Sequence, residues 1–343
     1  MAARIVGVGK YLPSKVLTNA DLERIVETSD EWIVERTGIR ERHIAADDET
    51  TATMGARAAR MALDTAGLSA DQIDLVVCAT LSPDGMFPAS ASLIQDDIGA
   101  KNAAAFDVNA ACNGFVVALA TATQFINGGV YERVLVVGAE AISRILDWTD
   151  RSTCILFGDG AGAVVLEKAE SGGPSAFILK SDGSGANLLY ARGPASAPAS
   201  FLQSESYCIV MDGREVFKFA VRSMEDVSRQ AIEQAGLTND DIAYLVPHQA
   251  NYRIMTAYAK ALGFGPERLL SNVDKYGNTS SASIPIALCE AWEEGRLHPG
   301  DKLVISAVGG GLSWGACIAE WTGVGSKLAP KTPVDLQNLV GGG

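Results

Sequence analysis

Apolar runs and apolar residues at helical spacing alternate along most of this chain. They predict a strand at residues 5–8, a short helix at residues 22–32 and a buried strand at residues 103–108. After the buried strand, Phe115 and Leu119 return to one side of a predicted helix. Strands that alternate with helices in this way are typical of an α/β protein.

The chain also repeats itself, and the repeat divides it into two similar halves. Residues 62–77 recur as residues 231–246, at a displacement of 169 positions, and each copy reads as a helix, a glycine and a strand. The same displacement relates residues 132–138 to residues 301–307. Because the apolar helices of each copy need a partner, we expect two similar mixed sheets packed through helices about a pseudo-dyad.

The two halves differ in length at one place. Residues 162–167 match residues 315–320 at a displacement of 153, so the first half holds about 16 more residues before this point. We assign the excess to residues 139–157 and predict a functional insertion there. The resulting divisions are residues 1–170, residues 171–322 and a flexible tail at residues 323–343.

Cys112 stands where the strand at residues 103–108 passes into the predicted helix. The unpaired N–H groups and positive potential of a helix start can lower a cysteine pKa from about 8.5 and leave thiolate at neutral pH. A small buried core residue is the alternative, because free cysteines are among the most buried residue types. This stretch alone leaves both interpretations open.

The repeat relates Cys112 to other polar residues. At the displacement of 169, Asn109 matches Asn278 and Cys112 matches Ser281. Of the three histidines, His248 alone lies between a predicted buried strand and a helix. Such a histidine is more often structural, but a pseudo-dyad would bring Cys112, His248 and Asn278 to one face. The three are therefore candidate catalytic residues, with Cys112 as the nucleophile.

Composition argues against several classes of function. The 343 residues include six cysteines without a C-x-x-C pair, which argues against a zinc site or a disulfide framework. The formal charge of −13 disfavours binding to nucleic acid or to an anionic membrane. The N-terminus lacks a signal-like pattern and no apolar run reaches about 18–20 residues, so we expect a soluble, cytoplasmic protein without a membrane span.

An anionic ligand would need a local basic patch on such an acidic chain. One predicted helix carries Arg214, Lys218 and Arg222, and another carries Arg253 and Lys260. A solvated helix face explains this spacing equally well. Trp32 precedes Arg36 by one helical turn, so this pair could clamp a planar, phosphate-bearing ligand, or it could belong to a surface turn.

Two glycine-rich segments differ in what they indicate. Residues 158–163 resemble a phosphate-binding loop only superficially, because they precede a strand and do not open a helix, so no dinucleotide site is predicted. Residues 309–315 form a predicted turn whose glycines let the backbone approach another group closely. Such a turn suits an oxyanion hole and suits tight packing equally.

Six motifs in order resemble one family, the β-ketoacyl-acyl-carrier-protein synthase III enzymes, over about residues 5–321. The motifs are EWIVERTGI (31–39), NAACNGF (109–115), GDGAGA (158–163), VPHQAN (246–251), YGNTSSAS (276–283) and GGGLSWG (309–315). Because that family has the thiolase fold, the resemblance implies an α/β protein with two duplicated mixed-sheet halves in a five-layer αβαβα arrangement.

The resemblance also implies an acyltransferase that begins fatty acid synthesis without a metal or another cofactor. Cys112 would take the acyl group of acyl-CoA, and His248 with Asn278 would act on malonyl-acyl carrier protein, giving 3-oxoacyl-acyl carrier protein and CO₂. The enolate formed by decarboxylation needs hydrogen-bond donors, which a histidine and an asparagine amide provide. The backbone N–H groups of Cys112 and Gly310 would form the oxyanion hole for the acylated cysteine.

Further residues match binding positions of the family. Trp32, Arg36, Arg151 and Asn251 would bind CoA, Ile142, Phe157 and Leu189 would line the acyl pocket, and Arg214, Lys218, Arg253 and Lys260 would dock the carrier protein. Phe87 would close the acyl pocket of a neighbouring subunit, which implies a homodimer. Ala261, Leu81 and residues 194–204 depart from the family pattern, so the starter acyl group and the strength of docking stay open.

Other interpretations use the same residues differently. A relative from secondary metabolism would combine them with another acceptor or a polyketide starter. A thiolase needs a second cysteine in the C-terminal glycine turn, whereas Cys317 lies in the following strand, and a hydroxymethylglutaryl-CoA synthase-like enzyme needs a glutamate near Ala79. A non-catalytic carrier-binding subunit would not need Cys112, His248 and Asn278 together.

Overall fold

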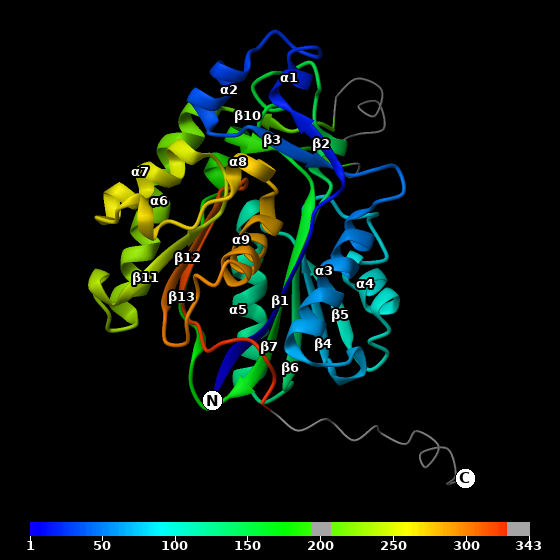
Figure 1. Ribbon diagram of the computed structural model, residues 1–343, viewed down its shortest axis with the longest axis vertical. Helices are drawn as coiled ribbons and strands as arrows, with labels where there is room; N and C mark the ends of the chain where they lie inside the picture. The colour runs from blue at the N-terminus through cyan, green and yellow to red at the C-terminus, as the bar shows by residue number, and fades with distance from the viewer. Residues whose placement is uncertain (194–206, 328–343) are drawn as a thin grey trace.

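Two mixed sheets and three layers of helices make up the protein, as the computed structural model of residues 1–193 and 207–327 shows. From left to right in Figure 1 the layers are outer helices, a sheet, two central helices, a second sheet and outer helices. The predicted αβαβα arrangement of two duplicated halves is therefore confirmed.

The first half builds a five-stranded sheet in the order β1-β7-β6-β4-β5. Its strands are β1 (Ala2–Tyr11), β4 (Leu75–Ala79), β5 (Ala104–Val108), β6 (Arg133–Glu140) and β7 (Gly160–Ala169). The helices α3 (Thr51–Ala66) and α4 (Ser90–Ile98) cover its outer face, and α5 (Gly114–Asn127) covers its inner face (Figure 1). Strands β5, β4 and β6 run parallel, so their carboxyl ends share one edge of the sheet.

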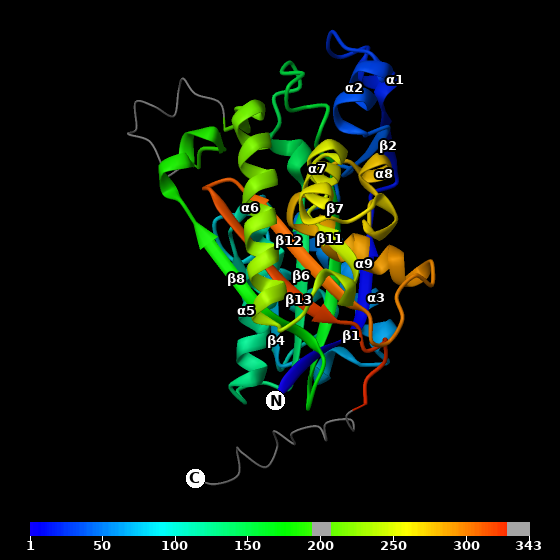
Figure 2. The same ribbon diagram turned by 90° about the vertical axis from the view of Figure 1, so that its left-hand side faces the viewer.

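The second half builds a four-stranded sheet in the order β11-β12-β13-β8. Its strands are β8 (Gly173–Ser181), β11 (Ile242–Pro247), β12 (Lys302–Gly309) and β13 (Ser313–Glu320). Helices α6 (Gly213–Gln234) and α7 (Tyr252–Leu262) cross the outer face in Figure 2, and α9 (Ser283–Glu293) lies inside. The first sheet has β5 beside β4, but the second sheet has no such strand beside β11 among the described residues. A single parallel bridge between Leu245 and Leu269 is found there, and the short helix α8 (Val273–Tyr276) follows it.

The internal repeat appears in the positions of the elements. The short 3₁₀ turns η2 (Ala111–Asn113) and η8 (Ser280–Ala282) begin 169 residues apart, as do the helices α5 and α9 that follow them. Residues 141–159 connect β6 to β7, whereas residues 310–312 connect β12 to β13. The extra residues of the first half therefore lie where the sequence predicted them.

A cap of short elements lies above the sheets, and here the predicted helix at residues 22–32 is wrong. The cap contains β2 (Lys15–Thr18), α1 (Asn19–Leu22), α2 (Asp30–Thr37) and β3 (Glu41–Ile44). Helix α1 ends at Leu22, and α2 begins only at Asp30 because the Ser29 hydroxyl accepts a hydrogen bond from the Trp32 N–H at 3.2 Å. Gly38, with φ of 76°, ends α2.

Two further predictions need correction. The strand predicted as buried, β5, is an edge strand whose residues are exposed or half-buried. The tail predicted as flexible from residue 323 is anchored at its start, because Gly325 N–H donates to Val6 O at 2.7 Å and Ser326 N–H donates to Ala66 O at 2.9 Å. The remainder of that tail, residues 328–343, lies outside the described residues.

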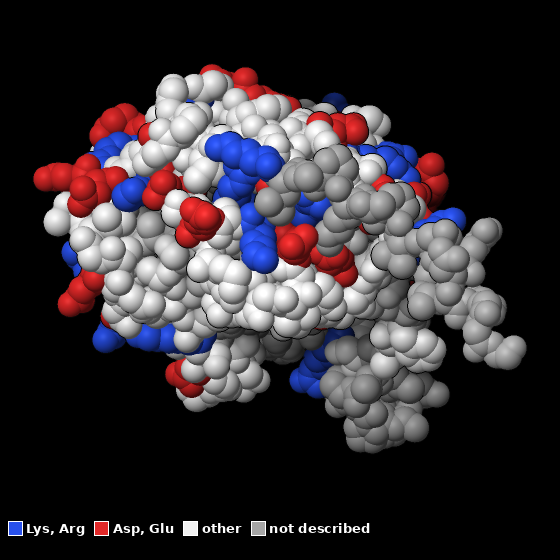
Figure 3. All heavy atoms as spheres, turned by 90° about the horizontal axis from the view of Figure 1, so that it is seen from below, with Lys and Arg blue, Asp and Glu red and all other residues white. Residues whose placement is uncertain are grey.

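The surface at the end where β1 begins mixes charges of both signs. Lysine, arginine, aspartate and glutamate side chains are interspersed among uncharged residues on this face (Figure 3). The net charge of −13 therefore does not appear here as a field of one sign. Within residues 1–193 and 207–327, none of the helices is both long enough and apolar enough to cross a membrane.

The two halves meet at glycines in the strand ends. A Cβ atom built on Gly138 in β6 would lie 2.4 Å from the Ser281 carbonyl oxygen of η8. In the other half, a Cβ atom on Gly309 of β12 would lie 2.7 Å from the Cys112 backbone nitrogen of η2. Backbone thus packs directly on backbone, and each 3₁₀ turn is held against the opposite sheet.

We predict that Gly138→Ala lowers the free energy of unfolding by about 1–3 kcal/mol, because the new methyl group must displace backbone atoms of η8. Chemical denaturation monitored by circular dichroism measures this change. Gly183→Ala is the matched control, since a Cβ atom there meets nothing within 4 Å, and it should stay within about 0.5 kcal/mol of the wild type. Equal stability of the two variants would contradict the close contact.

Candidate active site

The turn that carries Cys112 has an unusual backbone. Ala111 has φ of 48°, a conformation that non-glycine residues seldom adopt, and Cys112 follows it at the entrance to α5. At the equivalent place in the second half, Ser280 has φ of 51° and precedes Ser281. Such strained residues persist only where surrounding packing holds them, and here the glycine contacts of β6 and β12 supply that packing.

His248 follows β11 directly and is buried, as the strand pattern predicted. Its Nδ1 lies 2.7 Å from the Ser283 hydroxyl, which itself donates to the Ser280 carbonyl oxygen at 2.7 Å. Burial lowers the pKa of His248 to about 3. The imidazole is therefore neutral at physiological pH.

Asn278 lies between η8 and the insertion of the first half. Its backbone N–H donates to Leu156 O at 2.8 Å and its carbonyl oxygen accepts from Gly158 N–H at 3.1 Å. Its side-chain Oδ1 accepts a hydrogen bond from Ser280 N–H at 2.8 Å. The amide nitrogen is then the group of this side chain that can serve a ligand in the cavity.

One cavity of about 300 Å³ brings the three candidate catalytic residues together with most of the predicted CoA-binding residues. Its lining includes Cys112, His248, Asn278, Trp32, Arg36 and Asn251. The Arg36 guanidinium lies 4.6 Å from the centre of the Trp32 ring, and that of Arg151 lies 5.2 Å from it. The two guanidinium groups and the Trp32 ring therefore form one cluster. The spacing of Trp32 and Arg36 in the sequence predicted that these two side chains would lie together.

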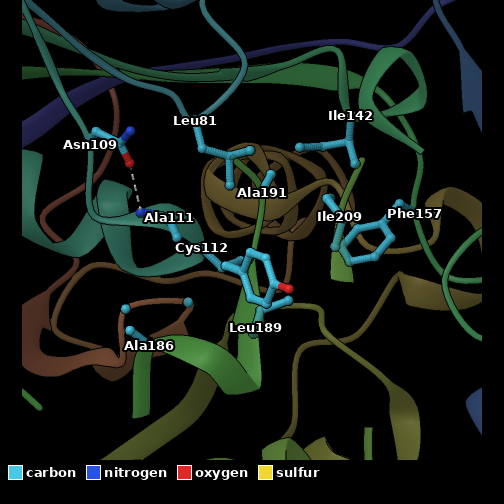
Figure 4. A pocket seen from close by; sticks show the side chains of 13 residues that line it. Leu81, Asn109, Ala111, Cys112, Ile142, Phe157, Ala186, Leu189, Ala191 and Ile209 are labelled. Atoms are coloured by element: carbon cyan, nitrogen blue, oxygen red, sulfur yellow. Dashed lines mark hydrogen bonds between the residues drawn. The ribbon is translucent and has the colours of Figure 1, made fainter. Parts of the chain in front are cut away.

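Cys112 also lines a second, mainly apolar cavity of about 280 Å³ (Figure 4). Leu81, Ile142, Phe157, Leu189, Ile209 and Gly310 are among its lining residues. The predicted pocket residues Ile142, Phe157 and Leu189 therefore lie together. Cys112 lines both cavities, so a group attached to its sulfur can reach the apolar cavity while another ligand occupies the polar one.

The other predicted binding residues do not line these cavities, with one exception. Arg253 lines the polar cavity, whereas Arg214, Lys218 and Lys260 lie exposed on α6 and α7. Lys218 forms an ion pair with Glu215 at 2.7 Å. Phe87 is 85% exposed and lies outside both cavities of its own chain. The exposure of the three basic side chains and of Phe87 agrees with a docking role and equally with a solvated surface. Carrier docking and closure of a neighbouring pocket therefore stay predictions.

The expected lowering of the Cys112 pKa is wrong in direction. Burial raises the pKa of this thiol to about 12, and the nearby Glu140 adds to the rise, although Ser280 acts against it. The loss of hydration outweighs the helix start, because the side chain is only 6% exposed. The thiol is therefore protonated at neutral pH, and His248 in the same cavity is neutral.

Sequence reasoning missed several residues around the site. Ile209 lines the apolar cavity, but the residues before it gave no pattern that places it there. Ser283 contacts His248, and its place in the same motif as Asn278 was a usable signal. Glu140 is fully buried, and the only sign in the sequence is a lone acidic residue at the end of an apolar strand.

Comparison with known proteins gives a consistent result. Residues 106–183 match the family model for 3-oxoacyl-[acyl-carrier-protein] synthase III, and residues 232–321 match the model for its C-terminal part. The β-ketoacyl-[acyl-carrier-protein] synthase III of Agrobacterium fabrum is 51% identical over 321 residues, which cover 92% of this chain and 98% of the relative.

Solved structures agree with the sequence relatives. The 3-oxoacyl-[acyl-carrier-protein] synthase III of Aquifex aeolicus superposes with a TM-score of 0.88 at 48% identity, covering 93% of this chain and all of that one. The priming β-ketosynthase of the R1128 polyketide pathway superposes with a TM-score of 0.88 at 36% identity, covering 93% and 96% of the two chains.

The raised pKa of Cys112 predicts how its alkylation depends on pH. Because the folded-state pKa of about 12 lies above the assay range, the thiolate fraction should rise with pH throughout that range. The rate of iodoacetamide modification at Cys112 should increase about tenfold per pH unit from neutral pH upward, with no plateau near pH 8.5. Peptide mass spectrometry after timed quenching measures this rate, with Cys112→Ala as the control. A plateau below pH 7 would show a thiolate instead.

Proposed function

The chain belongs to the β-ketoacyl-acyl-carrier-protein synthase III family, and on that premise we propose that it catalyses the condensation that initiates fatty acid synthesis. Acyl-CoA and malonyl-acyl carrier protein are the substrates, and 3-oxoacyl-acyl carrier protein, CoA and CO₂ are the products. The reaction runs in two half-reactions through an acyl group on Cys112. The observation that carries this proposal is the single cavity lined by Cys112, His248 and Asn278.

In the first half-reaction the Cys112 sulfur attacks the thioester carbonyl carbon of acyl-CoA, and the thiol proton passes to the departing CoA sulfur. Both Cys112 and His248 are neutral before acyl-CoA reacts. The backbone N–H groups of Cys112 and Gly310 stabilise the oxyanion. The bond to the CoA sulfur then breaks, and CoA leaves as a thiol carrying the proton that Cys112 lost.

In the second half-reaction His248 and the amide of Asn278 donate hydrogen bonds to the thioester oxygen of the malonyl group. His248 does so with its proton on Nε2, once the Ser283 hydroxyl turns from the Ser280 carbonyl oxygen to donate to Nδ1. Loss of CO₂ leaves an enolate at that oxygen, and its carbon attacks the acyl carbonyl on Cys112. The thiolate that departs from the acyl group takes a proton from solvent. The hydrogen bond from Ser280 N–H to Asn278 Oδ1 supports this role, since it fixes the amide and leaves its N–H groups for the ligand.

The two cavities suggest where each substrate binds. We assign the CoA nucleotide to Trp32, Arg36 and Arg151 and the pantetheine arm to Asn251, because three of these line the polar cavity and Arg151 covers Trp32. The acyl group occupies the apolar cavity beside Ile142, Phe157 and Leu189. The carrier protein docks on the exposed basic residues Arg214, Lys218, Arg253 and Lys260, which an acidic partner would meet.

We also infer a homodimer. Strand β5 presents an unpaired edge, and the segment between β4 and β5 carries exposed apolar side chains at Met86, Phe87 and Leu93. Phe87 is free to reach a neighbouring subunit, because it lies outside the cavities of its own chain.

The central prediction separates the two half-reactions by mass. Incubation with a panel of acyl-CoAs should add one acyl mass to the wild type and to Asn278→Ala, and none to Cys112→Ser. Product formation with malonyl carrier protein should fall by about 10²-fold or more in Asn278→Ala, because one donor to the enolate oxygen is lost. Intact-mass spectrometry reads the adduct and identifies the starter. A polyketide-type primer would reveal itself as a preference for unusual starters with the same adduct on Cys112.

A second prediction separates the binding of CoA from that of the carrier. Trp32→Ala should raise the KM for acyl-CoA by about tenfold through lost stacking, but should leave the rate with a truncated acyl thioester that lacks the nucleotide unchanged. Lys260→Glu should raise the KM for malonyl carrier protein only, with an effect that shrinks as salt rises. Steady-state kinetics with each substrate varied measures both, and equal effects on the two KM values would contradict the assignment.

The homodimer predicts a mass in solution of about twice the 36.0 kDa of one chain. Phe87→Asp should weaken the dimer, because it places a charge on the apolar contact, whereas Ile25→Asp on the exposed cap should not. Sedimentation velocity at micromolar concentration distinguishes them. A monomeric wild type would exclude the inferred interface.

A further inference from the structure

Glu140, the last residue of β6, is a fully buried carboxyl group that the proposed reaction does not use. Its neighbours are hydroxyls and backbone N–H groups from two places far apart in the chain. Residues 80–82 follow β4 in the first half, and Ser281 belongs to η8 in the second half. The side chain therefore joins the two halves beside Cys112, whose pseudo-dyad equivalent is Ser281.

One carboxyl oxygen of Glu140 acts only as an acceptor. Oε2 lies 3.1 Å from the Leu81 nitrogen, 3.2 Å from the Ser82 nitrogen, 2.6 Å from the Ser82 hydroxyl and 3.1 Å from the Thr80 hydroxyl. Both hydroxyls have a proton to give. Thr80 Oγ1 accepts from Ser82 N–H and Ser82 Oγ accepts from Ala141 N–H, so each is left to donate to Glu140.

The other oxygen has a different environment. Oε1 lies 2.8 Å from the Ser281 hydroxyl oxygen and accepts a long hydrogen bond from the Ser281 N–H at 3.4 Å. The same hydroxyl oxygen lies 2.8 Å from the Ala79 carbonyl oxygen. A serine has one hydroxyl proton, and a carbonyl oxygen has none, so a single proton cannot satisfy both contacts if Glu140 is ionised. If Glu140 carries a proton on Oε1, it donates to Ser281, and Ser281 donates to Ala79.

The surroundings also favour the neutral acid. Burial raises the pKa of Glu140 and outweighs the opposing hydrogen bonds from Ser82, Ser281, Leu81 and Ser280, because an ionised carboxylate buried among neutral groups is costly. The thiols of Cys78 and Cys112 lie close enough to feel its charge, and neither offers a positive charge. An un-ionised acid satisfies the hydrogen-bond pattern and the burial together.

Both ends of this connection touch the site. Leu81, whose N–H donates to Glu140, lines the apolar cavity next to Ile142 (Figure 4). Ser281 follows Ser280, whose N–H orients Asn278 and whose carbonyl oxygen accepts from the Ser283 hydroxyl beside His248.

We propose that Glu140 is a positioning residue that acts as an un-ionised carboxylic acid and joins the wall of the acyl pocket to the turn that holds Asn278 and His248. Its effect on condensation rests on the function proposed above, whereas its protonation does not. Glutamine is the matched substitute for such an acid. Its carbonyl oxygen can take the place of Oε2, and its amide can donate to Ser281 as Oε1–H does.

Infrared difference spectroscopy between the wild type and Glu140→Gln tests the protonation state without any assay of activity. At neutral pH the wild type should show the carbonyl band of a carboxylic acid that disappears in Glu140→Gln and persists in Glu132→Gln, an exposed control. A carboxylate band in its place would overturn the neutral acid, whatever the enzyme catalyses.

Kinetics test the positioning role. Glu140→Gln should keep condensation within about threefold of the wild type, and Glu140→Ala should lower it by about 10–100-fold, as for other residues that orient catalytic groups. Ser281→Ala serves if Glu140→Ala does not fold, and it should lower condensation while acylation of Cys112, read by intact mass, stays within about twofold. Unchanged condensation in the folded variants would overturn the positioning role, and a loss of about 100-fold or more in folded Glu140→Gln would indicate a proton-transfer role instead.

Discussion

Contact between backbone and backbone at the pseudo-dyad is the constraint on which the rest of this structure depends. Gly138 lies near the end of β6 and Gly309 at the end of the equivalent strand β12, and each packs on the 3₁₀ turn of the opposite half. Because no side chain separates them, the turns at Cys112 and Ser281 are held in conformations that non-glycine residues rarely adopt. The site exists because two duplicated halves share one packing surface.

The two duplicated halves contribute different residues to the site. The first half supplies Cys112 and the long connection between β6 and β7, which carries Ile142, Arg151 and Phe157 to the cavities. The second half keeps a tight turn at the equivalent place and supplies His248 and Asn278 instead. Glu140 of the first half contacts Ser281 of the second half, and it also accepts a hydrogen bond from the N–H of Leu81 in the pocket wall. Glu140 therefore connects the pocket wall to the turn of the second half.

Much of this organisation could be predicted from the sequence, because a repeat reports on tertiary structure. The displacement of 169 located both 3₁₀ turns, and the change to 153 located the insertion. Properties that depend on neighbours from other elements were not accessible in this way. The Cys112 pKa follows from burial by both halves, the edge position of β5 follows from sheet order, and the start of α2 follows from a single capping serine. Glu140 was overlooked because a charged residue at the end of a strand usually marks solvent.

The burial of Cys112 also bears on how the protein withstands oxidants. Peroxide oxidises a cysteine most readily when the side chain is exposed and the sulfur is a thiolate. The Cys112 side chain is only 6% exposed, and its pKa of about 12 keeps the thiol protonated. The thiol reacts only when a thioester is bound beside it, and it is not ionised beforehand. A nucleophile kept in this resting form is spared sulfenic acid formation between turnovers.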